Sequence, residues 1–465
     1  TVALEGVDAG NYFRLEAIDG GVLYLNREKP GFLKYNAVND STRDELDLYH
    51  YKLEAKPGKK RKAKKLIEGI SNYHLSADGK KLVYRAGEKI SVVDVGEEAK
   101  VGDGEIDLAK VKFKIDRNAE FMQVFNEAWR VQRDWFYDAK MHGVDWQAVG
   151  EMYRKFVPSC GNRSDLGYLI GEMISELNAG HTYSYGGDLS DKPKKVETGM
   201  LGADFDVSKD GKYPRIAHII PGVTWDDALR SPMAGPGSPI KEGDFLIAID
   251  GVEASTKEDI FRLLENKADR AVTITFNAKP AKEGARDYLV RTISSENAIR
   301  YREWVEGKRA AVAKATNGEV GYLHIPDMME EGLREFARAF YALHTKRAII
   351  IDDRYNTGGF VGDMIIDRLE RRLWAIQQPR EGKTARNPEG AFHGHLAVLI
   401  NEDTGSNGEY FAEAIKRKGL AKLIGMRTWG GAIGIEPHQP LIDGGTCTPP
   451  QFAPFDFTGQ WMIEG

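Results

Sequence analysis

The chain has 465 residues, of which 42% are hydrophobic and 29% charged, and its formal net charge is -5. This balance is typical of a soluble globular protein with several domains, and it excludes a general affinity for nucleic acid. Two cysteines exclude a disulfide framework, and no run approaches the ~20 apolar residues that insertion into a membrane requires.

Residues 1–105 have the alternating pattern of β-strands. Residues 12–18 alternate, Asp19-Gly20-Gly21 reads as a turn, and residues 22–25 return as a second strand. Residues 76–84 read Ser-x-Asp-Gly-Lys-x-Leu-x-Tyr, which is typical of a β-propeller blade. About two blades cannot close a ring, so we expect this chain to be the C-terminal part of a longer protein.

A basic run, Lys59 to Lys65, interrupts this β region. A cluster of this kind binds an anionic partner in some proteins, but a solvated loop between two strands is the simpler interpretation. We therefore predict a hairpin loop at this position.

From Asn118 the hydrophobic period changes to 3.6 residues, which predicts helices over residues 118–135, 145–157 and 163–178, the last with Ser164 as its N-cap. Together they predict a small helical bundle, which we bound at residues 118–190. The last helix stops before Gly180-His181, in a segment rich in aromatic residues and glycine. On local pattern alone, His181 is either a satisfied structural histidine or a functional one.

Residues 196–297 resemble a PDZ domain. The carrying segments are Ser231-Pro232-Met233-Ala234 and Gly243-Asp244-Phe245-Leu246, the latter followed by Ile249-Asp250-Gly251. A helix over residues 257–265 and a strand over residues 272–276 complete the pattern. PDZ domains bind an extended peptide along the edge of a sheet.

Residues 298–465 alternate between strands and helices, which predicts an α/β domain with a mostly parallel sheet. We expect strands over 320–325, 347–353 and 396–400, and helices over 332–344, 361–373 and 410–418. Active sites of such sheets lie in loops at the carboxyl ends of the strands. Two such loops are Asn356–Gly359 and Asp403–Gly408, and the second places Ser406 at a tight turn before a helix, as an exposed nucleophile or simply as an N-cap.

These segments, taken in order, resemble the tricorn protease family, a branch of the serine peptidases that includes the tail-specific proteases. The match runs from about residue 118 to the end of the chain. It rests on residues 127–137 and 141–146, Gly180-His181-Thr182-Tyr183, residues 353–359 and 390–394, the Ser406 turn, residues 425–431 and Glu464.

The resemblance implies that Ser406 is the nucleophile, His181 its general base and Glu464 the residue that orients His181. A serine hydroxyl becomes an effective nucleophile when an imidazole takes its proton. The family relays Glu464 through a serine just before the histidine, and this chain has Gly180 there. Thr182, Ser184 or a water are the candidates to replace that hydroxyl.

The resemblance also implies an oxyanion hole made by the backbone N–H groups of Gly359 and Asn407, with Gly358 beside the substrate. The family has an acidic residue in the pocket for the first substrate side chain. The matching position here is Gln377, and a neutral amide does not pair with Lys or Arg as a carboxylate does.

The sequence thus predicts a serine endopeptidase that cleaves oligopeptides or unfolded polypeptides, with the PDZ and propeller parts positioning or filtering them. A catalytically inactive peptide-binding scaffold is the alternative. A Ser–Lys dyad of the tail-specific type is excluded because Gly431 stands where its lysine would be. A carboxylate pair at Asp352 and Asp353 is disfavoured because adjacent strand residues point to opposite faces.

The resemblance implies neither a cofactor nor a metal, and no His/Cys/Asp cluster has ligand spacing. It implies peptide substrates as partners and a homo-oligomer, with a hexamer as the expected assembly. The expected location is cytoplasmic, or periplasmic if a signal sequence lies upstream of this chain. The family continues beyond Gly465, so we expect further residues there as well.

Overall fold

The computed structural model describes residues 7, 10–27, 46–53, 61–189, 195–206, 211–226, 229–436 and 440–461. It divides the chain into two compact units, residues 1–115 and 116–465. Glu464 lies outside the described residues, so its predicted role has no structural account.

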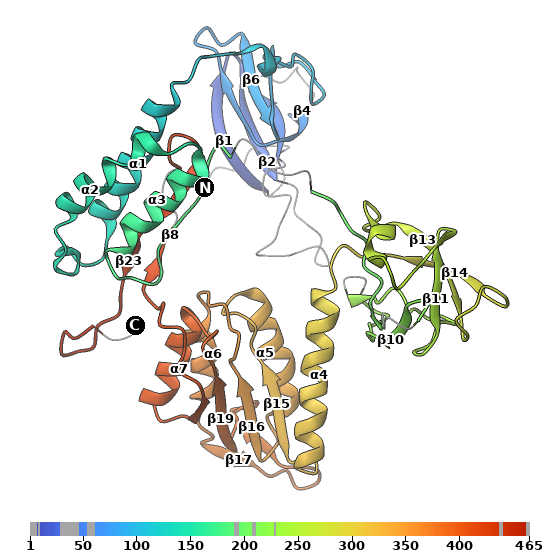
Figure 1. The fold of residues 1–465 in the computed structure, drawn as a ribbon. Helices are drawn as coiled ribbons and strands as arrows, with labels where there is room; N and C mark the ends of the chain where they lie inside the picture. The colour runs from blue at the N-terminus through green and yellow to red at the C-terminus, as the bar shows by residue number, and fades with distance from the viewer. Residues whose placement is uncertain are drawn as a thin grey trace. The chain divides into compact units, whose positions relative to one another are not determined.

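The first unit contains two antiparallel sheets, which confirms the predicted β character (Figure 1). One sheet has the order β1-β2-β3-β4 and the other β5-β6-β7. Leucines of the first sheet and Tyr73 and Tyr84 of the second share one buried core. The strands are β1 (Asn11–Ile18), β2 (Gly21–Arg27), β3 (Leu46–Lys52), β4 (Ala63–Ile70), β5 (Asn72–Leu75), β6 (Lys81–Ala86) and β7 (Lys89–Asp94).

Lys59 and Lys60 of the basic run lie outside the described residues, and the loop predicted for Lys59–Lys65 is wrong for its last three residues, which are in a strand. These residues begin β4, which pairs with β3. Lys64 forms an ion pair with Glu98 at 2.8 Å and Lys65 forms one with Asp47 at 2.6 Å. Both lysines are exposed and lie in ion pairs at the start of the strand.

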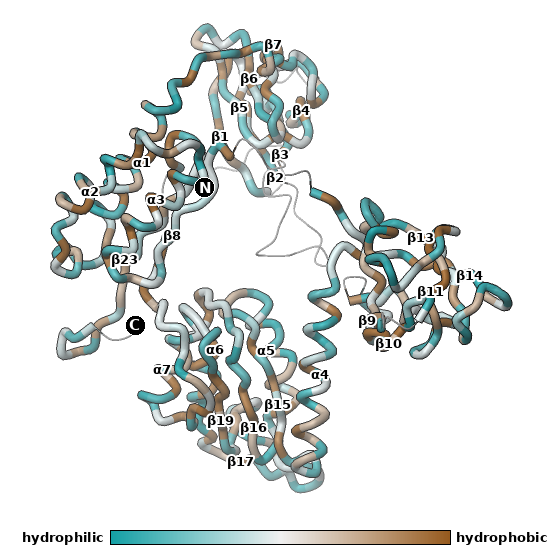
Figure 2. The backbone as a smooth tube through the Cα atoms, in the orientation of Figure 1, coloured by the Kyte–Doolittle hydropathy of each residue, from teal (hydrophilic) through white to brown (hydrophobic). Residues whose placement is uncertain are grey.

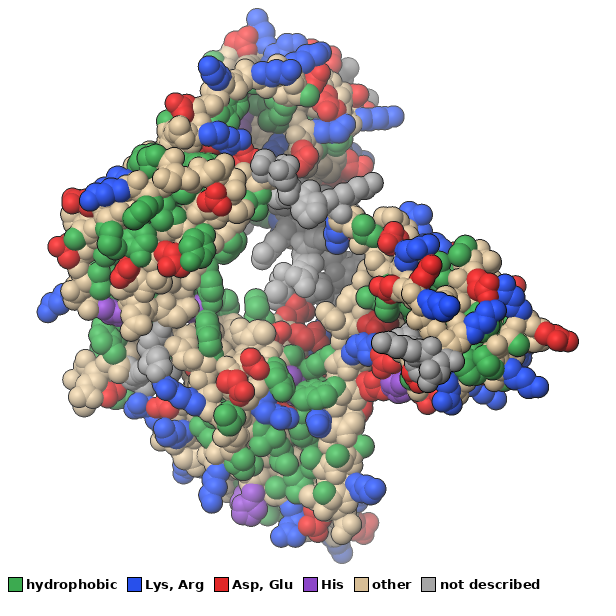
Figure 3. All heavy atoms as spheres, viewed as in Figure 1, with side chains coloured by type: hydrophobic (Ala, Val, Ile, Leu, Met, Phe, Trp, Pro, Cys, Tyr) green, Lys and Arg blue, Asp and Glu red, His purple; other side chains and the backbone are tan. Residues whose placement is uncertain are grey.

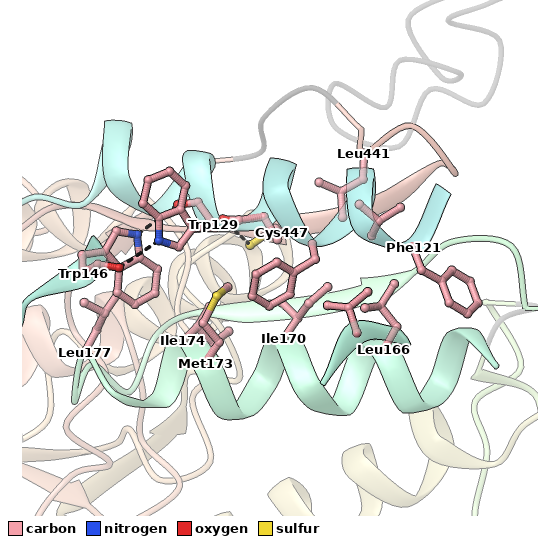
Figure 4. Close-up of a cluster of buried hydrophobic side chains, with 14 of the residues drawn as sticks. Phe121, Trp129, Trp146, Leu166, Ile170, Met173, Ile174, Leu177, Leu441 and Cys447 are labelled. Carbon is pink, nitrogen blue, oxygen red and sulfur yellow. Dashed lines mark hydrogen bonds between the residues drawn. The ribbon is translucent and has the colours of Figure 1, made fainter. Parts of the chain in front are cut away.

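The second unit begins with three helices, α1 (Arg117–Trp135), α2 (Trp146–Arg154) and α3 (Arg163–Ser175). Their apolar faces meet in the buried cluster of Figure 4, where the indole N–H of Trp129 donates to the Trp146 carbonyl at 2.9 Å. The N-cap of α3 is Asn162, whose side chain accepts from the Asp165 N–H, and not the predicted Ser164. The cap lies one residue before the helix begins because only there is the backbone extended.

The C-terminal segment of the chain completes this bundle. Leu441 and Cys447 are buried in the helical core, as Figure 4 shows. The strand β22 (Gly445–Thr448) pairs antiparallel with β8 (Tyr183–Gly186), which follows the helices. Arg163 of α3 forms a buried ion pair with Asp443. The two ends of the second unit therefore fold as one core.

The region predicted to be a PDZ domain is a small β structure with the strand order β14-β13-β11-β10-β9, with β12 also pairing with β11. The predicted helix over 257–265 is only the 3-10 turn Ile260–Leu264, capped by Asp259. The strands are β9 (Ala203–Asp206), β10 (Arg215–Ile219), β11 (Phe245–Ile249), β12 (Val252–Glu253), β13 (Ala271–Asn277) and β14 (Arg286–Arg291).

The α/β part contains a parallel sheet of β15 (Val320–His324), β16 (Ala348–Asp352), β19 (His395–Ile400) and β20 (Lys422–Gly425), in that order. Its strands are mostly apolar and are drawn largely in brown in Figure 2. Their side chains pack against those of the helices in one buried core. The helices are α4 (Asn297–Ala315), α5 (Glu330–Leu343), α6 (Gly362–Leu369) and α7 (Asn407–Arg417). A short pair of β17 (Ala375–Gln377) with β18 (Ala385–Asn387) completes it. The pair of β21 (Gly434–Ile435) with β23 (Pro450–Phe452) lies in the C-terminal segment, where the Pro450 carbonyl accepts from the Tyr137 N–H just after α1 at 2.9 Å.

Acidic and basic side chains are interspersed over the face shown in Figure 3. None of the described helices has both the length and the apolarity that crossing a membrane would require. Among the described residues, no group of three His, Cys, Asp or Glu side chains could hold a metal ion.

Candidate active site

Ser406 lies at a sharp turn between the carboxyl end of β19 and the start of α7. Its backbone has φ 52° and ψ -122°, a region that non-glycine residues rarely adopt. The helix begins at Asn407, three residues earlier than predicted, so Ser406 is the residue immediately before it. A strained residue at a strand-to-helix turn presents its hydroxyl at the top of the sheet.

The loop Asn356–Gly359 approaches this turn closely. A Cβ on Gly358 would lie 2.5 Å from the Ser406 Cβ, and the φ of Gly358 is +83°. A Cβ on Gly359 would lie 2.1 Å from the Met328 carbonyl oxygen. Glycine is therefore required at both positions for the loop to approach Ser406.

Two backbone N–H groups flank Ser406. Asn407 is the first residue of α7, where helical N–H groups lack intrahelical acceptors. Gly359 lies between Gly358, whose N–H donates to the Asn356 side chain at 2.8 Å, and Phe360, whose N–H donates to the Met328 carbonyl at 2.6 Å. Neither the Gly359 nor the Asn407 N–H donates a hydrogen bond to another described residue. An oxyanion hole needs two such unpaired donors.

His181 is buried, with 9% of its surface exposed, and lies edge-on to the rings of Tyr183 and Trp429. Its Nδ1 lies 2.6 Å from the Ile433 carbonyl oxygen. A carbonyl only accepts hydrogen bonds, so Nδ1 carries the proton and Nε2 is the basic nitrogen.

One cavity of about 470 Å³ brings these groups together. His181 follows the helical part, the residues from 359 to 410 belong to the α/β part, and the residues from 432 to 454 belong to the C-terminal segment. The lining residues are His181, Gly359, Phe360, Asp363, Ser406, Asn407, Tyr410, Ala432, Gly434, Ile435, Phe452, Ala453 and Pro454. Ser406, His181, Gly359 and Asn407 therefore line one and the same cavity.

Glu409 is a residue of this site that our sequence analysis missed. It is buried, and its Oε1 accepts from the Ser406 N–H at 3.1 Å and from the Gly431 N–H at 3.0 Å. Its Oε2 accepts from the Gly430 N–H at 2.6 Å. The signal was present as Ser-x-x-Glu, the pattern of a helix capping box.

Asp352 and Asp353 are both buried, with different partners. Asp352 accepts from Arg354 and from the Tyr322 hydroxyl at 2.7 Å. Asp353 accepts from the Asn356 amide at 2.9 Å, and its other oxygen has no hydrogen-bond partner among the described residues. Burial, opposed by the Asn356 bond, raises the pKa of Asp353 well above its usual range.

Other predicted residues are not brought into the cavity. Gln377 ends β17, where it is exposed, and it is not among the lining residues. Thr182 donates its hydroxyl to the Thr448 carbonyl at 2.8 Å, and the buried Ser184 hydroxyl has no partner among the described residues. Gly358 lies close to Ser406 but is not among the lining residues. The substrate contacts of Gln377 and Gly358 stay predictions.

Three family profiles match consecutive parts of the chain. They are the tricorn protease C1 domain over residues 117–175, the tricorn protease PDZ domain over residues 199–295 and peptidase family S41 over residues 319–465. Each covers one of the parts described above, from the helical bundle to the parallel sheet.

Whole-chain comparisons agree. Tricorn protease homolog 1 of Streptomyces coelicolor is 31% identical over 98% of this chain and 43% of its own length. The tricorn protease of Thermoplasma acidophilum is 32% identical over 96% of this chain and 40% of its own length. A crystal structure of the tricorn protease superposes with a TM-score of 0.85 at 31% identity, covering 97% of this chain and 43% of that one. The chain spans less than half the length of these relatives, and it belongs to the tricorn protease family.

Proposed function

We propose that this chain carries the catalytic site of a serine peptidase of tricorn type, with Ser406 as nucleophile and His181 as general base. The observation that supports this most strongly is a cavity lined by His181, Ser406, Gly359 and Asn407, where the N–H groups of the last two donate to no other residue that the structure describes. A structural N-cap serine would not need an imidazole and two free donors beside it.

The substrate peptide lies in the cavity with its scissile carbonyl against Ser406. Nε2 of His181 takes the hydroxyl proton as Oγ attacks, and the carbonyl oxygen becomes an oxyanion held by the Gly359 and Asn407 N–H groups. The protonated His181 gives its proton to the leaving amine. Water then hydrolyses the acyl-enzyme, with His181 again acting as base.

Backbone groups supply most of the proposed stabilisation of the transition state. Each oxyanion donor contributes about 3–4 kcal/mol to transition-state stabilisation in comparable sites. The N-terminus of α7 adds its partial positive charge to the same oxygen. The Ile433 carbonyl accepts from Nδ1 of His181 and so orients the imidazole. We propose that Glu464, which lies outside the described residues, helps to orient the same ring.

The test is labelling of the full chain by a fluorophosphonate probe together with cleavage of a peptide library. Wild type is expected to label and to cleave, Ser406→Ala to do neither, and His181→Ala to label about 10²–10⁴-fold more slowly. Ser175→Ala, which removes a hydroxyl from an exposed site on α3, is the matched control and should behave as wild type. Equal turnover by wild type and Ser406→Ala rejects the proposal, and absence of labelling in folded wild type favours the inactive scaffold.

We further propose that residues 1–105 are the end of a β-propeller, that the protein is a homo-oligomer with six subunits, and that it acts in the cytoplasm on oligopeptides. The two antiparallel sheets and the family membership support the first of these, and the family resemblance supports the others. Sedimentation analysis of the complete natural protein tests the assembly. A monomer that cleaves peptides would contradict it.

A further inference from the structure

A groove of about 710 Å³ follows the edge strand of the PDZ domain. The strand is β9, which is the last in the sheet order and pairs with β10 within the described sheet. The opposite wall consists of residues 256–261, which lead into the 3-10 turn. PDZ domains bind an extended peptide by adding it to such an edge. The groove therefore has the shape for a peptide strand.

The end of this groove already holds a carboxylate of the chain itself. Gly202, directly before β9, has φ +70°, and its N–H donates to Oε1 of Glu296 at 2.7 Å. A Cβ on Gly202 would lie 2.5 Å from the Ser231 hydroxyl, so glycine is required there. A backbone N–H beside a left-handed residue is the arrangement that captures the terminal carboxylate of a peptide.

Glu296 is fixed in this position. Its Oε2 accepts from Nε of Arg300 at 2.8 Å, and the same guanidinium donates to Asp204 of β9 at 2.7 Å. The Glu296 side chain is only 10% exposed, and both Glu296 and Arg300 line the groove. The Gly202 N–H and the Arg300 guanidinium thus donate to the Glu296 carboxylate in the way that they would donate to the terminal carboxylate of a bound peptide.

The charge of the groove adds to this effect. Among the lining residues, Asp204, Glu258, Asp259 and Glu296 are acidic, and Lys257 and Arg300 are basic. A further carboxylate at this end would meet like charge and find its donors taken. Cationic side chains along the peptide would instead be attracted by the excess of acidic over basic residues in the lining.

We propose that Glu296 occupies the terminal-carboxylate position of the PDZ groove, so that the groove binds internal, cationic segments of extended polypeptides rather than free C-termini. This specificity is a property of the PDZ domain and does not depend on the proposed peptidase activity.

The experiment uses the full chain carrying Ser406→Ala, so that no probe is cleaved. Two fluorescent peptides share one lysine-containing sequence and differ only in a C-terminal acid or amide. The Kd values of the two for this protein should agree within about threefold, and Glu296→Ala should bind the acid at least about tenfold more tightly than the amide. A third peptide with glutamate in place of lysine should bind about tenfold more weakly than either.

Glu303→Ala is the matched control. Glu303 is on α4, directly before which Glu296 stands. It pairs with His218 at 2.6 Å outside the groove lining, so its loss removes one carboxylate without freeing the Gly202 N–H. It should keep the acid-to-amide ratio near one. Glu296→Gln is the second variant if Glu296→Ala does not fold, and it should show the same preference for the acid in weaker form.

Three results would overturn the proposal. The first is a tenfold or greater preference of the unaltered groove for the free acid, by about 1.4 kcal/mol. The second is an unchanged ratio in a folded Glu296 variant, verified by circular dichroism. The third is absence of binding of both lysine peptides to the unaltered groove.

Discussion

Glu409 connects the proposed nucleophile to the segment that positions the proposed base. Its carboxylate accepts from the N–H of Ser406 and from the N–H groups of Gly430 and Gly431. Two residues beyond Gly431, the Ile433 carbonyl accepts from His181. One buried carboxylate therefore sets the spacing between the alcohol and the imidazole, although it touches neither side chain.

Substitution of Glu409 by glutamine tests this positioning role. The amide replaces an acceptor with a donor, so at least one N–H loses its partner, at a cost of about 1–3 kcal/mol in unfolding free energy. We expect the catalytic rate constant for peptide cleavage to fall about 10–100-fold with little change in KM, because binding does not involve Glu409.

Glu413→Gln, one turn further along α7, is the control. Glu413 is more exposed and pairs with Arg417 at 2.6 Å, so the variant should lose less than about 1 kcal/mol and keep its activity. A loss confined to KM in the Glu409 variant would argue against positioning of Ser406.

Asp353 makes the stability depend on pH in an unusual direction. Burial raises its pKa in the folded chain, so between the pKa of the unfolded chain and this raised value the unfolded state releases a proton that the folded state keeps. The free energy of unfolding therefore falls as pH rises through that window, by about 1.4 kcal/mol per pH unit. Asp353→Asn should gain stability relative to wild type as pH rises above about 4, the pKa of an unperturbed Asp, measured by urea unfolding.

The neighbouring residue Asp352 makes the stability depend on pH in the opposite direction, which Asp352→Asn tests. Burial alone would raise the pKa of Asp352, but its hydrogen bonds from Arg354 and Tyr322 lower it. Its stabilisation is present above the pKa of the unfolded chain and lost as pH falls. The deficit of this variant should therefore shrink towards acid pH. Parallel pH curves for both variants and wild type would contradict these assignments.

Among the helices and strands, those with a strong hydrophobic period could be predicted from the sequence. The apolar strands of the sheet and the face of α1 have strong patterns, and they were found nearly where predicted. The helix α4 was missed because only Ile299 and Val305 are buried along its 19 residues, which leaves no apolar stripe. The early start of α7 was missed because Asn407 and Gly408 are poor helix formers, and Glu409 stabilises the turn from within the fold.

Some residues of the candidate site could likewise be predicted from the sequence, and others could not. Ser406 and His181 were named from motifs, and the cavity contains both. The carbonyl that fixes the His181 tautomer has no sequence signal, because any residue at position 433 supplies one. Gln377 was aligned by motif to a pocket whose described lining does not include it.

A buried ion pair between Arg163 and Asp443, whose side chains are 4% and 2% exposed, lies beside the paired strands β8 and β22. Asp443→Asn leaves a buried guanidinium without its counter-charge, which typically costs about 3–5 kcal/mol. We expect this loss in urea unfolding of the full chain, together with reduced labelling of Ser406. Lys418→Ala, which breaks an exposed pair with Glu370, should cost less than about 1 kcal/mol. Equal effects of the two substitutions would show that the buried pair has no special role.

At the scale of the whole molecule, the second compact unit contains every described residue of the site. Its helical core incorporates Leu441 and Cys447 from the far end of the chain, so the proposed base and nucleophile belong to one folding unit. Such a core should unfold cooperatively, because neither end can bury its apolar side chains alone.

Two fragments test this arrangement. Residues 116–465 should fold and react with a fluorophosphonate at a rate similar to that of the full chain, because they retain the complete cavity. Residues 195–465 retain Ser406 but lose His181 and the helices that cover Leu441 and Cys447. Exposure of these side chains should unpair the C-terminal segment, seen as fast amide exchange at residues 441–448, and labelling should be lost. Labelling of the shorter fragment at the full-chain rate would mean that the imidazole has no part in activating the serine. Loss of labelling by a folded 116–465 fragment would instead assign residues 1–115 a direct role in the site.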